Sequence, residues 1–122
     1  QQAGLNYRVA SLDYSCIPRA VAMRNTQGFI KIIIGENDYK ILGMRVIGQH
    51  SSSAIQAIAL LISDGRGIEE LAELIHPHPS IIEGIQECCR MLLNKSIMKP
   101  KVLTEAMYCR AYRDGVYTEI VD

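Results

Sequence analysis

The sequence predicts an α+β fold, in which an antiparallel sheet has helices packed on one face. Three observations carry this prediction. The first half contains alternating or β-branched segments, the apolar period changes to helical spacing near residue 51, and the helices follow the strands instead of alternating with them. The 122 residues, 48% of them hydrophobic, are sufficient for one domain with its own core.

Three strands are expected before that change. Residues 7–13 alternate loosely, residues 29–34 form a β-branched run, and residues 41–47 form another. The polar residues 35–38 separate the last two runs, which indicates a hairpin with a turn longer than two residues. Gly43 interrupts the last run, and a glycine within a strand often marks a bulge or a close backbone approach.

The first predicted helix is apolar on nearly every side. It covers residues 54–63, with Ser51, Ser52 and Ser53 as candidates for its N-cap and Gly65 as the left-handed residue that ends it. A helix of this kind is either deeply buried or lies in an interface. The sequence leaves both possibilities open.

Two further helices flank a proline-rich segment. Residues 68–75 predict a short amphipathic helix, which residues 76–79 (HPHP) stop because each proline favours extended backbone at the residue before it. The next helix is expected from Ser80 to about Asn94. Leu71, Leu74 and Ile75 give the first helix its apolar side, and Ile81, Ile85, Cys88 or Cys89, and Leu92 give the second its apolar stripe.

The last segment gives weaker patterns. Residues 104–111 are expected to form a short helix with Thr104 as its cap, and residues 116–121 are expected to form a strand.

Composition excludes several classes of function. The formal net charge is zero, which argues against a broad nucleic-acid surface and against attraction to an anionic membrane. The longest apolar run, residues 57–62, is far shorter than the roughly 20 residues of a membrane helix. The four cysteines form no Cys-x-x-Cys pair, so we expect reduced thiols in a cytoplasmic protein. The opening QQAG, without a signal peptide or an initiating Met, leads us to expect a fragment of a longer protein.

Residues 76–83 (HPHPSIIE) hold the candidate chemistry. Ser80 and Glu83 have the spacing of a helix capping box, which needs no function. Alternatively, Glu83 orients His78 for proton transfer, because a carboxylate on one ring nitrogen fixes the tautomer and stabilises the imidazolium. The two interpretations compete for one carboxylate, although its two oxygens could serve both. His76 ends a helix, where the helix dipole mildly favours a cation.

Other constellations are weaker. His76, His78, Cys88 and Cys89 have suitable donor atoms for a metal, but the cysteines lie about 15 Å along the helix from its start at ~1.5 Å per residue. We therefore expect no metal site. The chain also lacks a glycine-rich dinucleotide loop after a strand and a Gly-x-Ser-x-Gly nucleophile elbow.

Over about residues 3–98, the chain resembles the C-terminal dimerisation domain of the class I pyridine nucleotide-disulfide oxidoreductases. The resemblance rests on residues 19–23, on the hairpin segments 28–31 (GFIK) and 41–48 (ILGMRVIG), on the apolar helix 54–62, and most specifically on residues 71–83. It implies a dimerisation domain over residues 1–98, with residues 99–122 as a C-terminal extension.

Within that family, the doubled histidine followed by Ser and Glu resembles dihydrolipoamide dehydrogenases. Glutathione reductases usually carry a single His-Pro at this place, and mercuric reductases lack the histidine. This sequence departs from the family pattern at Pro77, where Ala is more usual, and at Ser80, where Thr is more usual. Neither departure affects the expected acid–base role.

The resemblance implies a homodimer in which His78 and Glu83 are catalytic. His78 would enter the active site of the other subunit and take a proton from a dihydrolipoamide thiol, while Glu83 holds its ring. The backbone of His78 and Pro79 would contact the flavin of that subunit, and the peptide bond between them would be cis. Lipoyl domains of a 2-oxo acid dehydrogenase complex are possible partners.

FAD, NAD and the redox cysteine pair would belong to upstream domains, so the isolated chain is expected to bind neither cofactor tightly and to be inactive. Two alternatives remain. The domain could serve a related disulfide reductase, such as one like glutathione reductase, or it could be a dimerisation module without a catalytic role.

Overall fold

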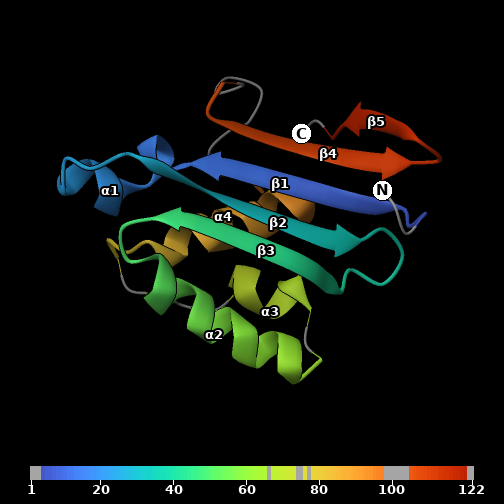
Figure 1. The fold of residues 1–122 in the computed structure, drawn as a ribbon, viewed down its shortest axis with the longest axis horizontal. Coiled ribbons are helices and arrows are strands. Elements are labelled where there is room, and N and C mark those ends of the chain that lie inside the picture. The colour runs from blue at the N-terminus through green and yellow to red at the C-terminus, as the bar shows by residue number, and fades with distance from the viewer. Residues whose placement is uncertain (1–3, 66, 74–75, 77, 98–104, 121–122) are drawn as a thin grey trace.

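The computed structural model describes residues 4–65, 67–73, 76, 78–97 and 105–120. Five antiparallel strands form one sheet in the order β3-β2-β1-β4-β5. Their bounds are Tyr7–Asp13 (β1), Gly28–Gly35 (β2), Ile41–Gly48 (β3), Met107–Arg113 (β4) and Val116–Glu119 (β5). Figure 1 shows β1 in the middle of the sheet, with the C-terminal hairpin beside it.

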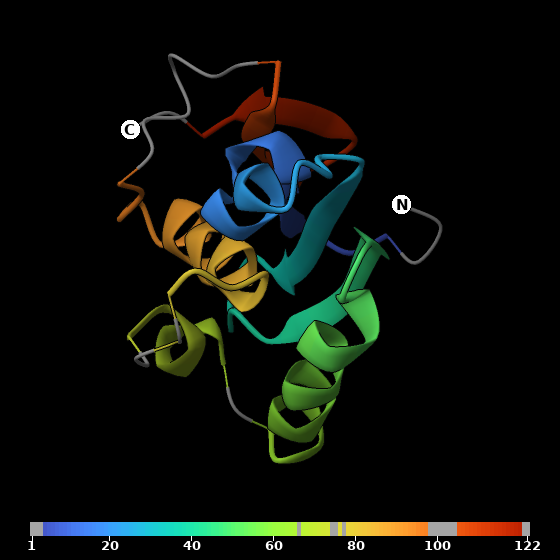
Figure 2. The ribbon, with the colours of Figure 1, turned by 90° about the vertical axis from the view of Figure 1, so that its left-hand side faces the viewer.

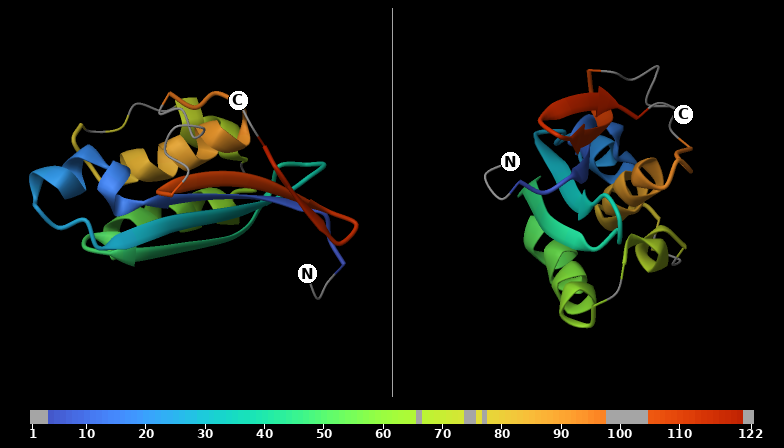
Figure 3. Two further views of the ribbon diagram at one scale, coloured as in Figure 1. Left: turned by 90° about the horizontal axis from the view of Figure 1, so that it is seen from above. Right: turned by 90° about the vertical axis from the view of Figure 1, so that its right-hand side faces the viewer.

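Helix α4 (Ile82–Leu92) and helix α3 (Ile68–Glu73) lie on the face of the sheet that is turned away from the viewer in Figure 1. Figure 3 shows α4 above that face and, within the described parts of the chain, no helix on the other. Helix α2 (Ser51–Ser63) instead runs along the β3 edge, as Figure 2 shows from the side. A 3-10 turn, η1 (Tyr14–Cys16), and the short α1 (Pro18–Ala22) connect β1 to β2. The predicted α+β fold, an antiparallel sheet with helices on one face, is confirmed.

The core lies between the sheet and α4. Alternate residues of the three central strands point into it, because successive side chains of a strand face opposite sides of the sheet. The buried strand residues on this face include Ala10 and Leu12 of β1, Ile30, Ile32 and Ile34 of β2, and Met107, Cys109 and Ala111 of β4. From α4, the predicted apolar stripe meets them with Ile81, Ile85, Cys88, Cys89 and Leu92. Register and burial therefore agree with the alternation in the sequence.

The three strands predicted in the first half are confirmed. The β2–β3 register shifts between Ile33 and Ile34, where Leu42 is the extra residue before Gly43. Gly43 thus marks a β-bulge, which is one of the two interpretations that the sequence offered. The other interpretation, a close backbone approach, is wrong, since nothing lies within 4 Å of the position that a Cβ would occupy at Gly43.

Helix α2 begins earlier than predicted, so Ser51, Ser52 and Ser53 lie inside its first turn. The preceding residue is His50, which is left-handed at φ 63° and makes no side-chain cap. The serines therefore do not cap the helix, because an N-cap hydroxyl acts from the non-helical residue just before the first turn. The predicted C-terminal end is confirmed, with Gly65 at φ +69°.

The C-terminal segment corrects one prediction. Residues 107–113 form β4, not a helix, and Thr104 lies outside the described residues. Met107, Cys109 and Ala111 are buried in alternation, and β4 pairs with β1 from Leu12 to Tyr7. Tertiary pairing outweighs the weak local helical preference. The predicted final strand is confirmed as β5.

Three predicted features lie outside the described residues. They are the boundary between residues 98 and 99, the end of the second helix at Leu74 and Ile75, and Pro77 in the loop. No helix in the part of the chain that the structure describes is long and apolar enough to cross a bilayer.

Candidate functional site

The loop before α4 brings His78 and Glu83 together. The Nδ1 atom of His78 lies 2.9 Å from Oε1 and 2.8 Å from Oε2 of Glu83. The His78 side chain is 67% exposed, whereas that of Glu83 is 23% exposed. The peptide bond between His78 and Pro79 is cis, as the resemblance implied. The carboxylate is thus held against the protein, while the ring extends into solvent.

Glu83 serves a second partner as well. Its Oε1 accepts a hydrogen bond of 2.9 Å from the backbone N–H of Ser80, so one half of the predicted capping box is present. The other half is missing, because the buried Oγ of Ser80 has no hydrogen-bond partner among the described residues. The two interpretations of Glu83 therefore do not exclude each other. One carboxylate accepts hydrogen bonds from both the loop backbone and the histidine ring.

The arrangement determines which ring nitrogen of His78 can act. Because carboxylate oxygens only accept hydrogen bonds, Nδ1 must carry the hydrogen that binds Glu83. The neutral ring then presents the lone pair of Nε2 outward, and a proton gained there gives an imidazolium that the adjacent carboxylate stabilises. The chemistry available at this site is acid–base exchange with a group brought from outside the chain.

His76 is separate from this pair. Its Nε2 lies 3.2 Å from the carbonyl oxygen of Leu71, so the ring donates to a carbonyl at the end of α3. This contact agrees with the predicted position of His76 at a helix end.

Two hollows adjoin the loop. One of about 570 Å³ is lined by Arg19, His50, Ser53, Ala54, and residues 79–82. A smaller one of about 160 Å³ includes His78, Glu83, Cys16 and Arg90 among its lining residues. The sequence suggested no part in this hollow for Arg19, His50 or Ser53, because three separate segments meet here only in the folded chain.

One cysteine adjoins the site. Cys16 lines the smaller hollow with His78, whereas Cys88, Cys89 and Cys109 are buried in the core, and none of the four forms a disulfide. Burial raises the pKa of Cys89 to about 12, so this thiol stays protonated near neutral pH. Across the described residues, no group of three or more His, Cys, Asp or Glu side chains is placed to hold a metal ion.

The family assignment rests on residues 1–89, which match the family model described as "Pyridine nucleotide-disulphide oxidoreductase, dimerisation domain". The chain belongs to this family. The match covers β1 to β3 and most of α4, including the whole loop that carries His78. It ends before β4 and β5.

Among curated relatives, the dimerisation domain is 35% identical over 100 residues to a dihydrolipoyl dehydrogenase of Chlamydia muridarum, an alignment that covers 82% of this chain and 22% of the relative. It is 31% identical over 94 residues to the dihydrolipoyl dehydrogenase of Geobacillus stearothermophilus, covering 77% of this chain and 20% of the relative. The chain thus spans about a fifth of the length of the curated relatives it matches.

Solved structures agree on the fold. The Cu(II) complex of the HOCl-induced flavoprotein disulfide reductase RclA from Escherichia coli is 25% identical, with a TM-score of 0.72 over 75% of this chain and 21% of that one. LpdA from Mycobacterium tuberculosis is 27% identical, with a TM-score of 0.66 over 70% of this chain and 19% of that one.

Proposed function

We propose that the domain belongs to a dihydrolipoamide dehydrogenase, a homodimer that oxidises dihydrolipoamide with NAD, and that His78 is the acid–base residue it contributes to the active site of the other subunit. The observation that carries the proposal is the pair of short contacts between His78 Nδ1 and Glu83 on an otherwise solvent-facing ring. The dihydrolipoyl dehydrogenases among its relatives support the choice of substrate.

The overall reaction is a two-electron oxidation of a dithiol. Dihydrolipoamide becomes a cyclic disulfide, NAD⁺ gains a hydride, and one proton is released. Thiolates, not thiols, attack a disulfide, so a base must first remove a thiol proton. Nε2 of His78 takes that proton, and Glu83 keeps the ring oriented and stabilises its charged form. Cys16 lines the hollow beside His78, but the other three cysteines are buried in the core, so in this proposal the redox pair is supplied by upstream domains.

The residues present fit one edge of a flavin, not a complete FAD site. Pro79 lines the larger hollow together with Ala54, Ile81 and Ile82, which offers a largely apolar surface to a flat ring. The backbone of His78 and Pro79 would contact the flavin of the other subunit. FAD and NAD would be held by upstream domains, where the flavin supplies the path for the electrons. The isolated chain would then bind neither tightly and would not turn over.

The test is His78→Gln in the full-length protein. We expect turnover of dihydrolipoamide to fall by about 10²-fold or more, the scale of a lost general base. Flavin content and dimer mass should stay unchanged. Turnover within about threefold of the unsubstituted protein would contradict the acid–base role and would favour a domain that only dimerises.

A second candidate is a related disulfide reductase. RclA, a flavoprotein disulfide reductase, matches this fold with a TM-score of 0.72. A panel of dihydrolipoamide, glutathione disulfide and an aromatic disulfide, assayed with the full-length protein, distinguishes the two. Preference for dihydrolipoamide supports the first proposal, and preference for another disulfide supports the second. If the first holds, lipoyl domains of a 2-oxo acid dehydrogenase complex are the expected partners, in the cytoplasm.

A further inference from the structure

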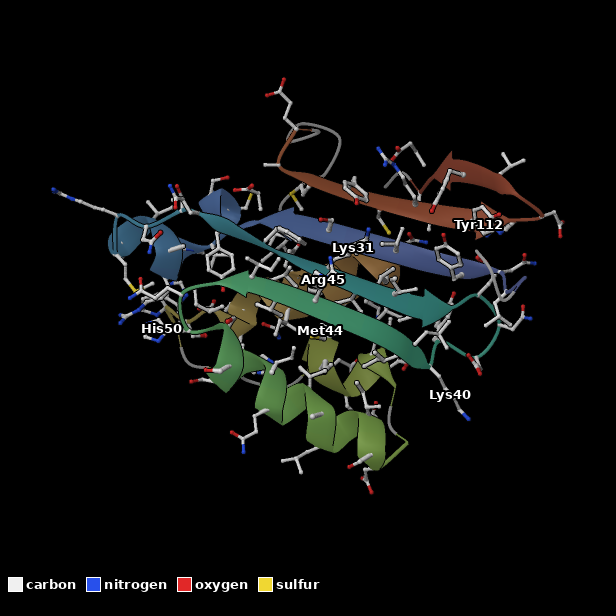
Figure 4. All side chains as sticks on the ribbon, in the orientation of Figure 1. Lys31, Lys40, Met44, Arg45, His50 and Tyr112 are labelled. Atoms are coloured by element: carbon white, nitrogen blue, oxygen red, sulfur yellow. The ribbon has the colours of Figure 1, made fainter. Side chains whose placement is uncertain are left out.

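The face of the sheet opposite α4 carries a row of polar side chains across four strands. Arg45 of β3 pairs in register with Lys31 of β2, Lys31 with Ser11 of β1, and Ser11 with Tyr108 of β4. Figure 4 shows Lys31 and Arg45 next to each other on the face toward the viewer. At ~4.8 Å between strands, the row is about 14 Å long.

This row lines a hollow of about 580 Å³. Ile33 and the ring of Phe29 add apolar surface, and Gly43 leaves the floor open because nothing lies within 4 Å of its missing Cβ. The volume falls in the range of small-molecule sites, about 300–1,000 Å³. The row and the hollow are thus one surface, with cations at one end and a hydroxyl group at the other.

The charge of the hollow is uncompensated by its own lining. Like charges directly opposite each other on paired strands are destabilising, as Lys31 and Arg45 are here. Two carboxylates share this face outside the hollow. Asp13, which pairs in register with Phe29, accepts the N–H of Ser15 and keeps its charge, whereas Glu119 is paired with Arg110. Neither carboxylate lines the hollow, so an anion from solution would relieve the repulsion.

We propose that this hollow binds a phosphate monoester that carries a planar ring. Arg45 and Lys31 hold the phosphate, since guanidinium and ammonium groups donate strong, charge-assisted hydrogen bonds to phosphate oxygens. The ring lies against Phe29, whose aromatic side chain offers a stacking surface, and toward Tyr108, over whose ring the Arg110 guanidinium lies at 4.2 Å. Ser11, between the two ends, donates or accepts a hydrogen bond. The site is independent of His78 and Glu83.

The experiment is an NMR titration of the 122-residue chain with adenosine monophosphate. We expect saturable shifts at the amides of Ser11, Lys31, Arg45 and Tyr108. Inorganic phosphate should perturb Lys31 and Arg45, and adenosine should bind more weakly than the monophosphate. No saturable change at these residues up to about 10 mM, well above the ~1 mM Kd of even a weak site, would overturn the proposal.

Two double variants with the same net charge sharpen the test. Lys31→Gln with Arg45→Gln should weaken binding by at least about tenfold, because both ionic hydrogen bonds are lost. The control is Lys40→Gln with Arg24→Gln, which changes two exposed cations outside the hollow. Figure 4 shows Lys40 at the hairpin turn. This control should leave the affinity within about twofold of the unsubstituted chain. Equal losses of affinity in both double variants would show that binding depends only on the net charge of the chain, and would overturn the proposed site.

Two more arms address the ring and the size of the ligand. Phe29→Leu should weaken adenosine monophosphate but not inorganic phosphate. A ten-residue oligodeoxythymidine that binds this face at least about tenfold more tightly than the mononucleotide would indicate a single-stranded nucleic acid and overturn the small-molecule proposal.

Discussion

At the scale of single residues, Glu83 determines the geometry of the loop. Its carboxylate accepts from the Ser80 backbone and from the His78 ring at once. The hydroxyl of Ser80, the other half of the expected capping box, is buried without a partner among the described residues. The acid–base candidate and the start of α4 therefore depend on the same side chain, and a change there should affect both stability and chemistry.

Glu83→Ala should lower the free energy of unfolding by about 0.5–2 kcal/mol, the usual cost of a lost N-terminal helix cap. Ser80→Ala is the matched control, since it removes a hydroxyl that makes no hydrogen bond and should cost less than about 0.5 kcal/mol or even stabilise. Urea unfolding of both variants measures the difference. Equal losses in the two variants would show that the Glu83 contact contributes nothing to the helix start.

At the scale of elements, two opposed glycines allow β2 and β3 to pair at the end of the hairpin that lies away from its turn. Gly28 pairs in register with Gly48, and both have positive φ, at +138° and +137°. A Cβ at Gly28 would lie 2.1 Å from the carbonyl oxygen of Ile47, and one at Gly48 would meet the ring of Tyr14. Only residues without a Cβ fit both the dihedrals and the space.

Gly28→Ala should therefore cost at least about 2 kcal/mol, from backbone strain of about 1–3 kcal/mol together with the clash. Gly43→Ala, in the same hairpin, meets open space at an ordinary φ and should stay within about 0.5 kcal/mol. Urea unfolding measures both variants, and the dependence of the unfolding free energy on urea concentration should be the same in each. If the two variants are equally stable, the left-handed backbone at Gly28 is not required for the hairpin.

A second contact joins elements at the opposite end of the sheet. Glu36, just after β2, binds Arg8 of β1 at 3.0 Å and Arg113 of β4 at 2.6 Å. Burial alone raises the pKa of Glu36, but the hydrogen bonds from Arg113 and Arg8 outweigh it and hold the pKa below its ordinary value.

A lowered pKa in the folded state gives stability that is present above the unfolded-state pKa and is lost as pH falls through the folded-state pKa. Glu36→Gln should thus be less stable than the unsubstituted chain at pH 7, and the difference should shrink as pH falls below about 4. Thermal unfolding from pH 7 to pH 2 measures this. A difference that is constant with pH would mean that the Glu36 charge does not contribute.

At the scale of the whole molecule, α2 leaves apolar surface uncovered. Ala54 and Ile58 are buried against the domain, whereas Ile55, Leu60 and Ile62 are exposed, Leu60 by 68%. The helix lies at the β3 edge, outside the layer formed by the sheet and α4 (Figure 2). An apolar helix face exposed in this way favours association, which agrees with a family described as a dimerisation domain.

If α2 forms the dimer contact, Leu60→Glu should weaken self-association by at least about tenfold, because a carboxylate would be buried against apolar surface. Val116→Glu is the control, since it places the same charge at an exposed apolar residue of β5 on the far edge of the sheet. Sedimentation equilibrium of both variants measures the two constants. Equal weakening, or none in the Leu60 variant, would place the contact away from α2.

Much of the fold was predictable from local pattern. The strand pattern in residues 7–13 and 29–47 and the helical spacing of the later segments both agree with the structure. They agree because the buried residues of a strand recur every second residue, and those of a helix about every 3.6 residues. Met107–Arg113 was not predictable, since its strand state depends on pairing with β1, nearly a hundred residues earlier in the sequence. Nor was the absence of caps at Ser51, Ser52 and Ser53, which depends on where the chain leaves β3.

The fold class was predictable from the order and apolar period of the segments, the family from its resemblance, and the pairing of His78 with Glu83 from spacing within a few residues. The folded chain was needed to show that Glu83 serves both the helix and the ring, that Arg19 and His50 lie beside Pro79, and that Lys31 and Arg45 meet on an open sheet face. Contacts of this kind arise from strand register and helix packing, which bring distant segments together and leave no mark in the local sequence.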